Sequence, residues 1–129
     1  MVRWMLVVAT AACLAASDAS AADGDQIVTQ CKSLLRTAKQ RGDTLDYRQD
    51  PDTVSCFAFM SAVQNLAVVA ERADAPPLLG ACLPPEGTLL QLIRAVVAYG
   101  KAHPPALRES AGVLALLALR DAYPCDKKG

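Results

Sequence analysis

Apolar side chains recur every three or four residues along most of the chain after residue 25, which is the spacing of helices that bury one face. The first run predicts a helix over about residues 26–40, with Asp23 and Asp25 near its positively polarised start. Its inward positions are Ile27, Cys31, Leu34, Leu35 and Ala38. Residues 41–50 lack this spacing and predict a polar loop.

A second helix is expected over residues 51–72. Asp50-Pro51 combines a favourable N-cap with a proline at the first helical position. The inward stripe of this helix is Cys56, Phe59, Met60, Val63, Ala67 and Ala70. Residues 74–85 hold four prolines and Gly80, so they predict a structured connection that cannot continue the helix.

Two more helices are expected in the second half. Thr88 and Gln91 have the spacing of a capping box, which opens a third helix. Its buried face is Leu89, Leu92, Ile93, Val96 and Val97. Gly100 and Pro104-Pro105 end it and lead into a fourth helix over about residues 106–122. Between residues 111 and 119 the fourth helix is apolar on every side, so it is either wrapped by the other helices or lends one side to a partner.

The connections between these helices predict the fold. A short proline corner joins the third and fourth helices, so we expect them to pack antiparallel. No run of residues shows the alternation of a strand. The predicted fold class is therefore all-α, a small disulfide-stapled bundle of four main helices with an antiparallel hairpin formed by the last two.

Four cysteines follow the first 21 residues and predict two disulfides. Cys82 precedes the third helix and Cys125 follows the fourth, so the antiparallel arrangement brings them together. Cys31 on the first helix is then left for Cys56 near the start of the second. Four cysteines allow three connectivities, and the sequence alone does not choose among them rigorously.

The first 21 residues have the pattern of an export signal. Arg3 precedes an apolar run over residues 4–14, and Ala19-Ser20-Ala21 supplies the small side chains that a signal peptidase needs. We therefore expect a signal peptide at residues 1–21, cleaved after Ala21 or Ala22. Residues 22–129 would then form a single helical domain in an oxidising compartment.

Two membrane interpretations fit less well. Thr10-Ala11-Ala12-Cys13 loosely resembles a lipoprotein box that would place a lipid on Cys13, but threonine suits its first position poorly and the downstream cleavage site is better formed. No later segment reaches the roughly 20 apolar residues of a membrane-spanning helix. We expect a soluble mature protein with no membrane span.

Charge and candidate catalytic groups exclude several functions. The chain has 13 basic and 13 acidic residues, without the positive footprint that binding of nucleic acid or an anionic membrane requires. The only basic run, Lys127-Lys128, is read as a solvated terminus. The cysteines are too far apart along the chain for an ordinary zinc site, and their even number suggests that all are paired. No metal or other cofactor is expected.

The one histidine, His103, lies at the expected end of the third helix, where a histidine commonly caps carbonyl groups. A cysteine or serine nucleophile would depend on this residue as its base. Carboxylates such as Glu86, Glu109 and Asp121 are dispersed among basic residues. We therefore predict no catalytic site and a protein that is not an enzyme.

Several segments together resemble the Rap/Tai immunity family of Gram-negative bacteria. The resemblance covers about residues 56–125. It is carried by Cys56-Phe57-Ala58-Phe59-Met60, Cys82-Leu83-Pro84, Gly87-Thr88 with Gln91-Leu92, His103-Pro104 with Leu107, Ala111, Leu114, Ala118 and Leu119, and Tyr123-Pro124-Cys125. One departure is that Ala58 and Ala62 stand where the family often has glycine. The resemblance implies a small, helical, periplasmic protein, and a homodimer.

Family members neutralise cell-wall amidase toxins delivered by type VI secretion. The resemblance therefore implies that this chain binds a protein partner, a peptidoglycan amidase effector. It also implies that the chain inhibits this effector by occluding the active-site cleft. The polar loop with Arg41, Asp43, Asp46, Tyr47 and Arg48 is the candidate partner-binding segment, because Tyr and Arg are frequent interface anchors. The alternative for this loop is an ordinary surface connection. The alternative function is a periplasmic acid-stress chaperone, which the zero net charge and 53% hydrophobic composition allow.

Overall fold

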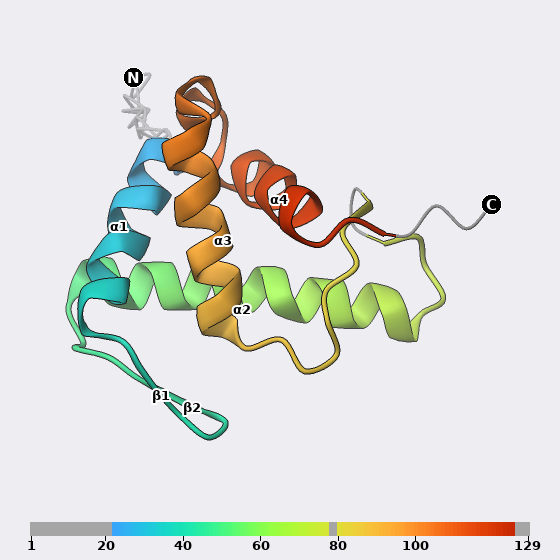
Figure 1. Ribbon diagram of the computed structural model, residues 1–129, viewed down its shortest axis with the longest axis horizontal. Coiled ribbons are helices and arrows are strands. Elements are labelled where there is room, and N and C mark those ends of the chain that lie inside the picture. The colour runs from blue at the N-terminus through green and yellow to red at the C-terminus, as the bar shows by residue number, and fades with distance from the viewer. Residues whose placement is uncertain (1–21, 78–79, 126–129) are drawn as a thin grey trace, which may run out of the picture.

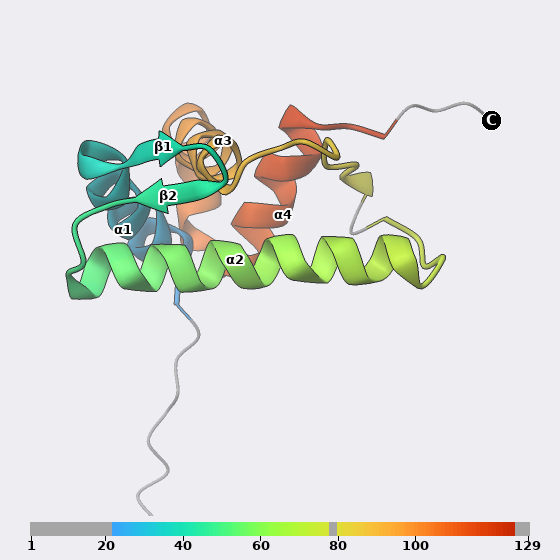
Figure 2. The same ribbon diagram turned by 90° about the horizontal axis from the view of Figure 1, so that it is seen from below.

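The computed structural model describes residues 22–77 and 80–125. The predicted signal peptide, Cys13 and the Lys127-Lys128 tail lie outside these residues. The elements in chain order are α1 (Gly24–Thr37), β1 (Lys39–Arg41), β2 (Thr44–Asp46), α2 (Pro51–Arg72), α3 (Leu89–Ala102), the 3-10 helix η2 (Pro104–Arg108) and α4 (Ala111–Ala122). Helices α1, α3 and α4 form a layer that lies across one side of the long helix α2 (Figures 1 and 2).

The core lies between this layer and the N-terminal half of α2. The largest fully buried side chains come from all four helices: Ile27 and Leu34 from α1, Met60 from α2, Leu92 and Ile93 from α3, and Leu114 and Leu119 from α4. Helix α4 also buries Ala111, Ala115 and Ala118. Val113 is 41% exposed, so α4 packs one side against its neighbours and is not wrapped on every side. Gly100 allows α3 to approach α1, because a Cβ there would lie 2.8 Å from Val28 Cγ2.

The local start signals of α2 and α3 are confirmed. Helix α2 begins and ends at the predicted residues, and Asp50 and Thr53 form a reciprocal capping box ahead of Pro51. Thr88 and Gln91 form the predicted capping box of α3. Helix α1 ends at Thr37, three residues before its predicted end, because Ala38 is extended and leads into a strand.

The prediction of an all-α fold is wrong, since residues 39–46 form an antiparallel β-hairpin. Its paired residues are Lys39 with Asp46, Gln40 with Leu45 and Arg41 with Thr44. Gly42 has a φ of 56°, a conformation that glycine adopts without steric cost and that allows the tight turn. Each strand has three residues, so the hairpin is too short to show the alternation that reveals a strand in a sequence.

The predicted antiparallel hairpin of the last two helices is also wrong. The antiparallel hairpin of this protein is β1–β2, whereas η2 and an extended Glu109 separate α3 from α4. Residues 109–111 are held next to residues 22–24 by two backbone hydrogen bonds, because Gly24 N–H donates to Glu109 O at 2.7 Å and Ala111 N–H donates to Ala22 O at 2.8 Å. Helix α4 therefore begins at Ala111 with Ser110 as its N-cap, five residues later than predicted.

Two disulfides link distant segments, and they are the two pairs expected from the sequence. Cys31 on α1 is bonded to Cys56 on α2, with 5.0 Å between their Cα atoms. Cys82 is bonded to Cys125, with 4.9 Å between their Cα atoms. Backbone hydrogen bonds support the second link, since Cys82 N–H donates to Tyr123 O and Cys125 N–H donates to Gly80 O.

Among the described residues, α2 is long and apolar enough to cross a membrane. The sequence had predicted no membrane-spanning helix. Its residues up to 63, however, bury Thr53, Cys56, Met60 and Val63, and Cys56 is bonded to α1. A mostly buried core helix can pass the same test, but only 22% of the tested 18-residue window of α2 is buried, so it is the disulfide to α1 that ties this helix to the domain. We therefore treat α2 as a helix of the folded domain.

Candidate functional site

The β-hairpin is the element that stands out furthest from the helices at the α1 end of the molecule (Figure 1). All residues from 39 to 44 are exposed, and Leu45 is half-buried. Arg41 Nε and Asp46 Oδ2 lie 3.1 Å apart, so these two predicted site residues pair with each other across the strands. The third, Asp43, lies at the turn. The free part of the hairpin thus presents mixed charge on a short rigid arm.

The root of the hairpin is fixed by the other two predicted site residues. The ring of Tyr47 stacks on Phe57 of α2, with 5.2 Å between ring centroids. The Arg48 guanidinium donates to Asp50 Oδ2 from Nε at 3.0 Å and from Nη2 at 2.9 Å. The Thr53 backbone N–H and the Arg48 side chain both hold the pKa of Asp50 below its ordinary value. Tyr47 and Arg48 therefore position the hairpin, and the free surface is left to Arg41, Asp43 and Asp46.

A hollow of about 640 Å³ lies beside the hairpin. It is an open depression between the hairpin, α2 and the chain that enters α3. Asp43, Thr44 and Leu45 line it on the hairpin side, and Phe57, Ser61 and Asn65 line it on α2. The predicted candidate loop therefore forms one wall of a concave surface, which sequence reasoning did not foresee.

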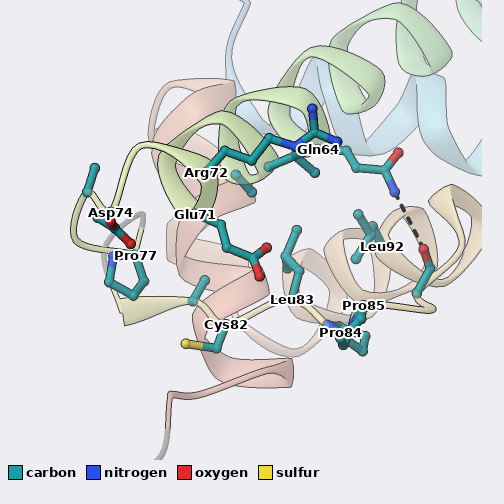
Figure 3. A pocket seen from close by; sticks show the side chains of 15 residues that line it. Gln64, Glu71, Arg72, Asp74, Pro77, Cys82, Leu83, Pro84, Pro85 and Leu92 are labelled. Carbon is teal, nitrogen blue, oxygen red and sulfur yellow. Dashed lines mark hydrogen bonds between the residues drawn. The ribbon is translucent and has the colours of Figure 1, made fainter.

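A larger hollow of about 800 Å³ lies further along α2. One side is the C-terminal half of α2 with Ala67, Val68 and Glu71, and the other is the connection around Leu83 and Pro84 (Figure 3). The two hollows share Gln64, Pro85 and Gly87. Gln64 Nε2 donates to Gly87 O at 3.5 Å across the boundary, as the dashed line in Figure 3 shows.

The wall opposite α2 is stiff. Pro84 and Pro85 restrict its backbone, and Gly87 N–H closes a turn by donating to Pro84 O at 2.9 Å. Only glycine fits at residue 87, because a Cβ there would lie 2.7 Å from Pro84 Cγ. The Cys82–Cys125 disulfide ties this wall to the end of α4. The sequence had indicated a structured connection here, but not the surface that it forms.

The side of α2 that faces away from the helical layer is apolar and exposed. Leu66 and Val69 are 60% and 61% exposed, and Val54 and Val68 are 44% and 40% exposed. Ala58 and Ala62, which replace the glycines frequent in the resembled family, also lie on the exposed side. Neither alanine is therefore part of the buried core of the domain.

His103 occupies the structural position expected for it. Its Nδ1 lies 3.1 Å from Tyr99 O, and its ring stacks on the Tyr99 ring at 4.1 Å between centroids. The residue thus caps the C-terminus of α3. Within the described ranges, no three His, Cys, Asp or Glu side chains gather where a metal ion could be held.

These features define a small, disulfide-bonded, mainly helical domain with an exposed arm and a concave face beside it. A family model described as Rap1a immunity proteins matches residues 23–125, and the chain belongs to this family. The match confirms the resemblance to immunity proteins and extends it from residue 56 back to the start of α1. Searches of the curated proteins and of the solved structures each found no match. Family membership implies a protein that binds an effector and that is not itself an enzyme.

Proposed function

We propose that this chain is an exported immunity protein that binds a cell-wall amidase effector of type VI secretion and occludes its active-site cleft. The observation that carries the proposal is the family match over residues 23–125. The two disulfides support export, since such bonds persist in oxidising compartments such as the periplasm. Inhibition then needs shape alone, because a partner that fills the cleft excludes the peptide substrate.

The β-hairpin is the element that we propose to enter the cleft. It is exposed along residues 39–44, and its root is held by the Tyr47–Phe57 stack and the Arg48–Asp50 ion pair. A preorganised arm loses less conformational freedom on binding than a flexible loop does. Arg41, Asp43 and Asp46 would then make the contacts with the effector.

A homodimer is the assembly that family resemblance implies, and we propose the outward face of α2 as its interface. Val54, Leu66 and Val69 expose apolar surface there, and Ala58 and Ala62 would allow a second helix to approach closely. Sedimentation equilibrium of the mature chain should show a dimer that Ala62→Glu converts to a monomer. A wild-type monomer at 100 µM or so would contradict the dimer without bearing on immunity.

Neutralisation of an effector is the direct test of the function. The mature chain and the exported hydrolase encoded by the neighbouring gene are co-produced in the periplasm, and growth of the cells is measured. In a second assay, the purified hydrolase is tested for cleavage of peptidoglycan with and without the purified mature chain. We expect restored growth and loss of amidase activity at about one immunity protomer or dimer per enzyme. A neighbouring gene without an exported hydrolase, together with no neutralised toxin, would overturn the proposal.

The exposed apolar half of α2 favours a second candidate, an acid-stress chaperone. Leu66 and Val69 would serve such a protein as client-binding surface. A chaperone of this kind opens in acid, so binding of a hydrophobic dye and protection of a client from aggregation should both rise between pH 7 and pH 2. A compact chain without such protection at pH 2 would rule this candidate out.

A further inference from the structure

We propose that the two hollows along α2 act as one groove that receives a positively charged, apolar-anchored segment of the effector. We call the surface formed by these two adjoining hollows, which meet at Gln64, Pro85 and Gly87, the α2 groove. The inference rests on the proposed function, because the occupant is assigned to the effector. It goes beyond cleft occlusion, because here the immunity protein is the concave partner.

Continuity is the first argument. The hollow beside the hairpin and the hollow beside residues 81–87 meet at Gln64, Pro85 and Gly87, which line both, and the hydrogen bond from Gln64 Nε2 to Gly87 O at this boundary is long at 3.5 Å. The two hollows therefore adjoin along the same side of α2. A segment lying along α2 could therefore run from the hairpin turn to the end of the helix.

The groove is lined by more acidic than basic side chains. Four carboxylates line the groove, those of Asp43, Glu71, Asp74 and Glu86, against one guanidinium, that of Arg72. The ion pairs found among the described residues join Arg41 to Asp46 and Arg48 to Asp50, and neither uses a groove carboxylate. Four acids beside one base make the groove a negative surface in a chain whose overall charge is zero. A negative concave surface favours a cationic occupant.

The orientation of the side chains supports the same reading. In Figure 3 the carboxylate of Glu71 points into the hollow toward Leu83, whereas Arg72 lies along the helix toward Gln64. Val68, Leu83 and Pro84 supply apolar surface between the charges. A lysine or arginine next to an apolar side chain matches this lining, since the stem packs on the wall and the head group meets a carboxylate.

Rigidity is the third argument. The groove wall is held by Pro84, Pro85 and the Cys82–Cys125 disulfide, while α2 forms the opposite side. A groove with two fixed sides loses little entropy when it is filled. The exposed disulfide thereby gains a role in binding, in addition to its role in stability.

The first test measures the affinity of the neutralised effector for the mature chain by calorimetry at 50 mM and 500 mM NaCl. The triple variant Glu71→Gln, Asp74→Asn, Glu86→Gln should bind roughly tenfold more weakly at low salt, with a smaller gap at high salt. Asp121→Asn, an exposed carboxylate on α4 outside the groove, should bind within about twofold of the wild type. Circular dichroism checks that all variants fold. Unchanged affinity of the triple variant would overturn the groove and leave the immunity function standing.

The second test needs no effector. The ¹⁵N-labelled mature chain is titrated with a capped ten-residue peptide of alternating leucine and lysine, and separately with its leucine–glutamate counterpart. We expect saturable shifts of the Gln64, Leu83 and Gly87 amides with the lysine peptide only. Equal shifts with both peptides, or shifts confined to the outward face of α2, would overturn the inference. If the effector fails to bind but the lysine peptide occupies the groove, the immunity function and the assignment of the occupant both fail, and only the preference of the groove for a cationic, apolar segment stands.

Discussion

The two disulfides of this protein lie in opposite surroundings. Cys31 and Cys56 are fully buried where α1 packs on α2, whereas Cys82 is exposed on the wall of the α2 groove. The loop-entropy model assigns them nearly equal effects on the unfolded chain, about 3.5 and about 4 kcal/mol for sequence separations of 25 and 43 residues. Their difference must therefore lie in the folded state. The buried bond belongs to the core, and the exposed bond positions a surface.

The largest effect should come from removing the buried bond. Replacing Cys31 and Cys56 by alanine removes the cross-link and leaves space where two sulfur atoms packed. We expect the free energy of unfolding to fall by about 5 kcal/mol, the upper end for a native disulfide. Urea denaturation of the mature double variant measures it. If this variant lost less free energy of unfolding than the Cys82–Cys125 double variant, the buried disulfide would not be the more important one for stability.

The same contrast should appear along α2. Met60, in the half that the buried disulfide ties down, is 0% exposed, whereas Leu66 in the other half is 60% exposed. We expect Met60→Ala to lower the free energy of unfolding by about 3 kcal/mol and Leu66→Ala to change it by less than about 0.5 kcal/mol. Both are measured by urea denaturation below the concentration at which the chain dimerises. Similar losses would mean that the C-terminal half of α2 is covered in solution.

The exposed bond should matter less for stability and more for binding. In the variant with Cys82 and Cys125 replaced by alanine, residues 80–82 gain freedom in the folded state, which offsets part of the unfolded-state effect. We expect a loss of about 2 kcal/mol. Hydrogen exchange should accelerate at the amides of residues 82 and 125, whose bonds to Tyr123 O and Gly80 O hold the segments together. Effector affinity should fall roughly as far as in the groove triple variant.

That third prediction has a matched control, since neither Cys31 nor Cys56 lines the groove. At a temperature where the core double variant is still folded, its affinity for the effector should stay closer to the wild type. If the core variant lost affinity and the wall variant did not, the assignment of the two bonds would be reversed.

The fold was predictable where signals are local. Asp50-Pro51 and the Thr88 capping box fix helix starts within four residues of sequence, and both helices begin where these residues predict. The hairpin was not predictable, because its strands are short and their side chains are almost all exposed. The late start of α4 was not predictable either. It depends on backbone bonds between residues 22–24 and 109–111, which are distant in sequence.

The candidate site divides in the same way. Sequence composition singled out Arg41, Asp43 and Asp46, and these lie on the free part of an exposed arm. It also singled out Tyr47 and Arg48, which the fold uses to anchor the arm. The groove combines residues from α2, the hairpin and the connection to α3. Its lining depends on packing, and the only sequence signal for it was the proline-rich composition of its wall.

The smallest effect concerns the hairpin root, at the end of α2 nearest the buried bond. The Asp50 carboxylate accepts the Thr53 N–H and pairs with Arg48, so the pKa of Asp50 lies below its ordinary value of 3.8. A lowered pKa means that the carboxylate stabilises the fold at every pH above about 3.8 and that this contribution is lost as the pH falls further. Hydrogen exchange of the Thr53 amide should therefore be constant from pH 7 to pH 5, after correction for the intrinsic rate, and accelerate below 3.8.

Asp50→Asn separates this effect from general acid unfolding. Asparagine can still cap α2, but it does not titrate and cannot form the ion pair with Arg48. In this variant, protection of the Thr53 amide should be slightly lower at pH 7 and should lack the additional loss below pH 3.8. The Cys82 amide on the groove wall should behave alike in both proteins. If exchange at the groove wall accelerated at a higher pH than exchange at the hairpin root, the wall would be the acid-sensitive end of the molecule. Such a result would favour the acid-stress chaperone as the function of this protein.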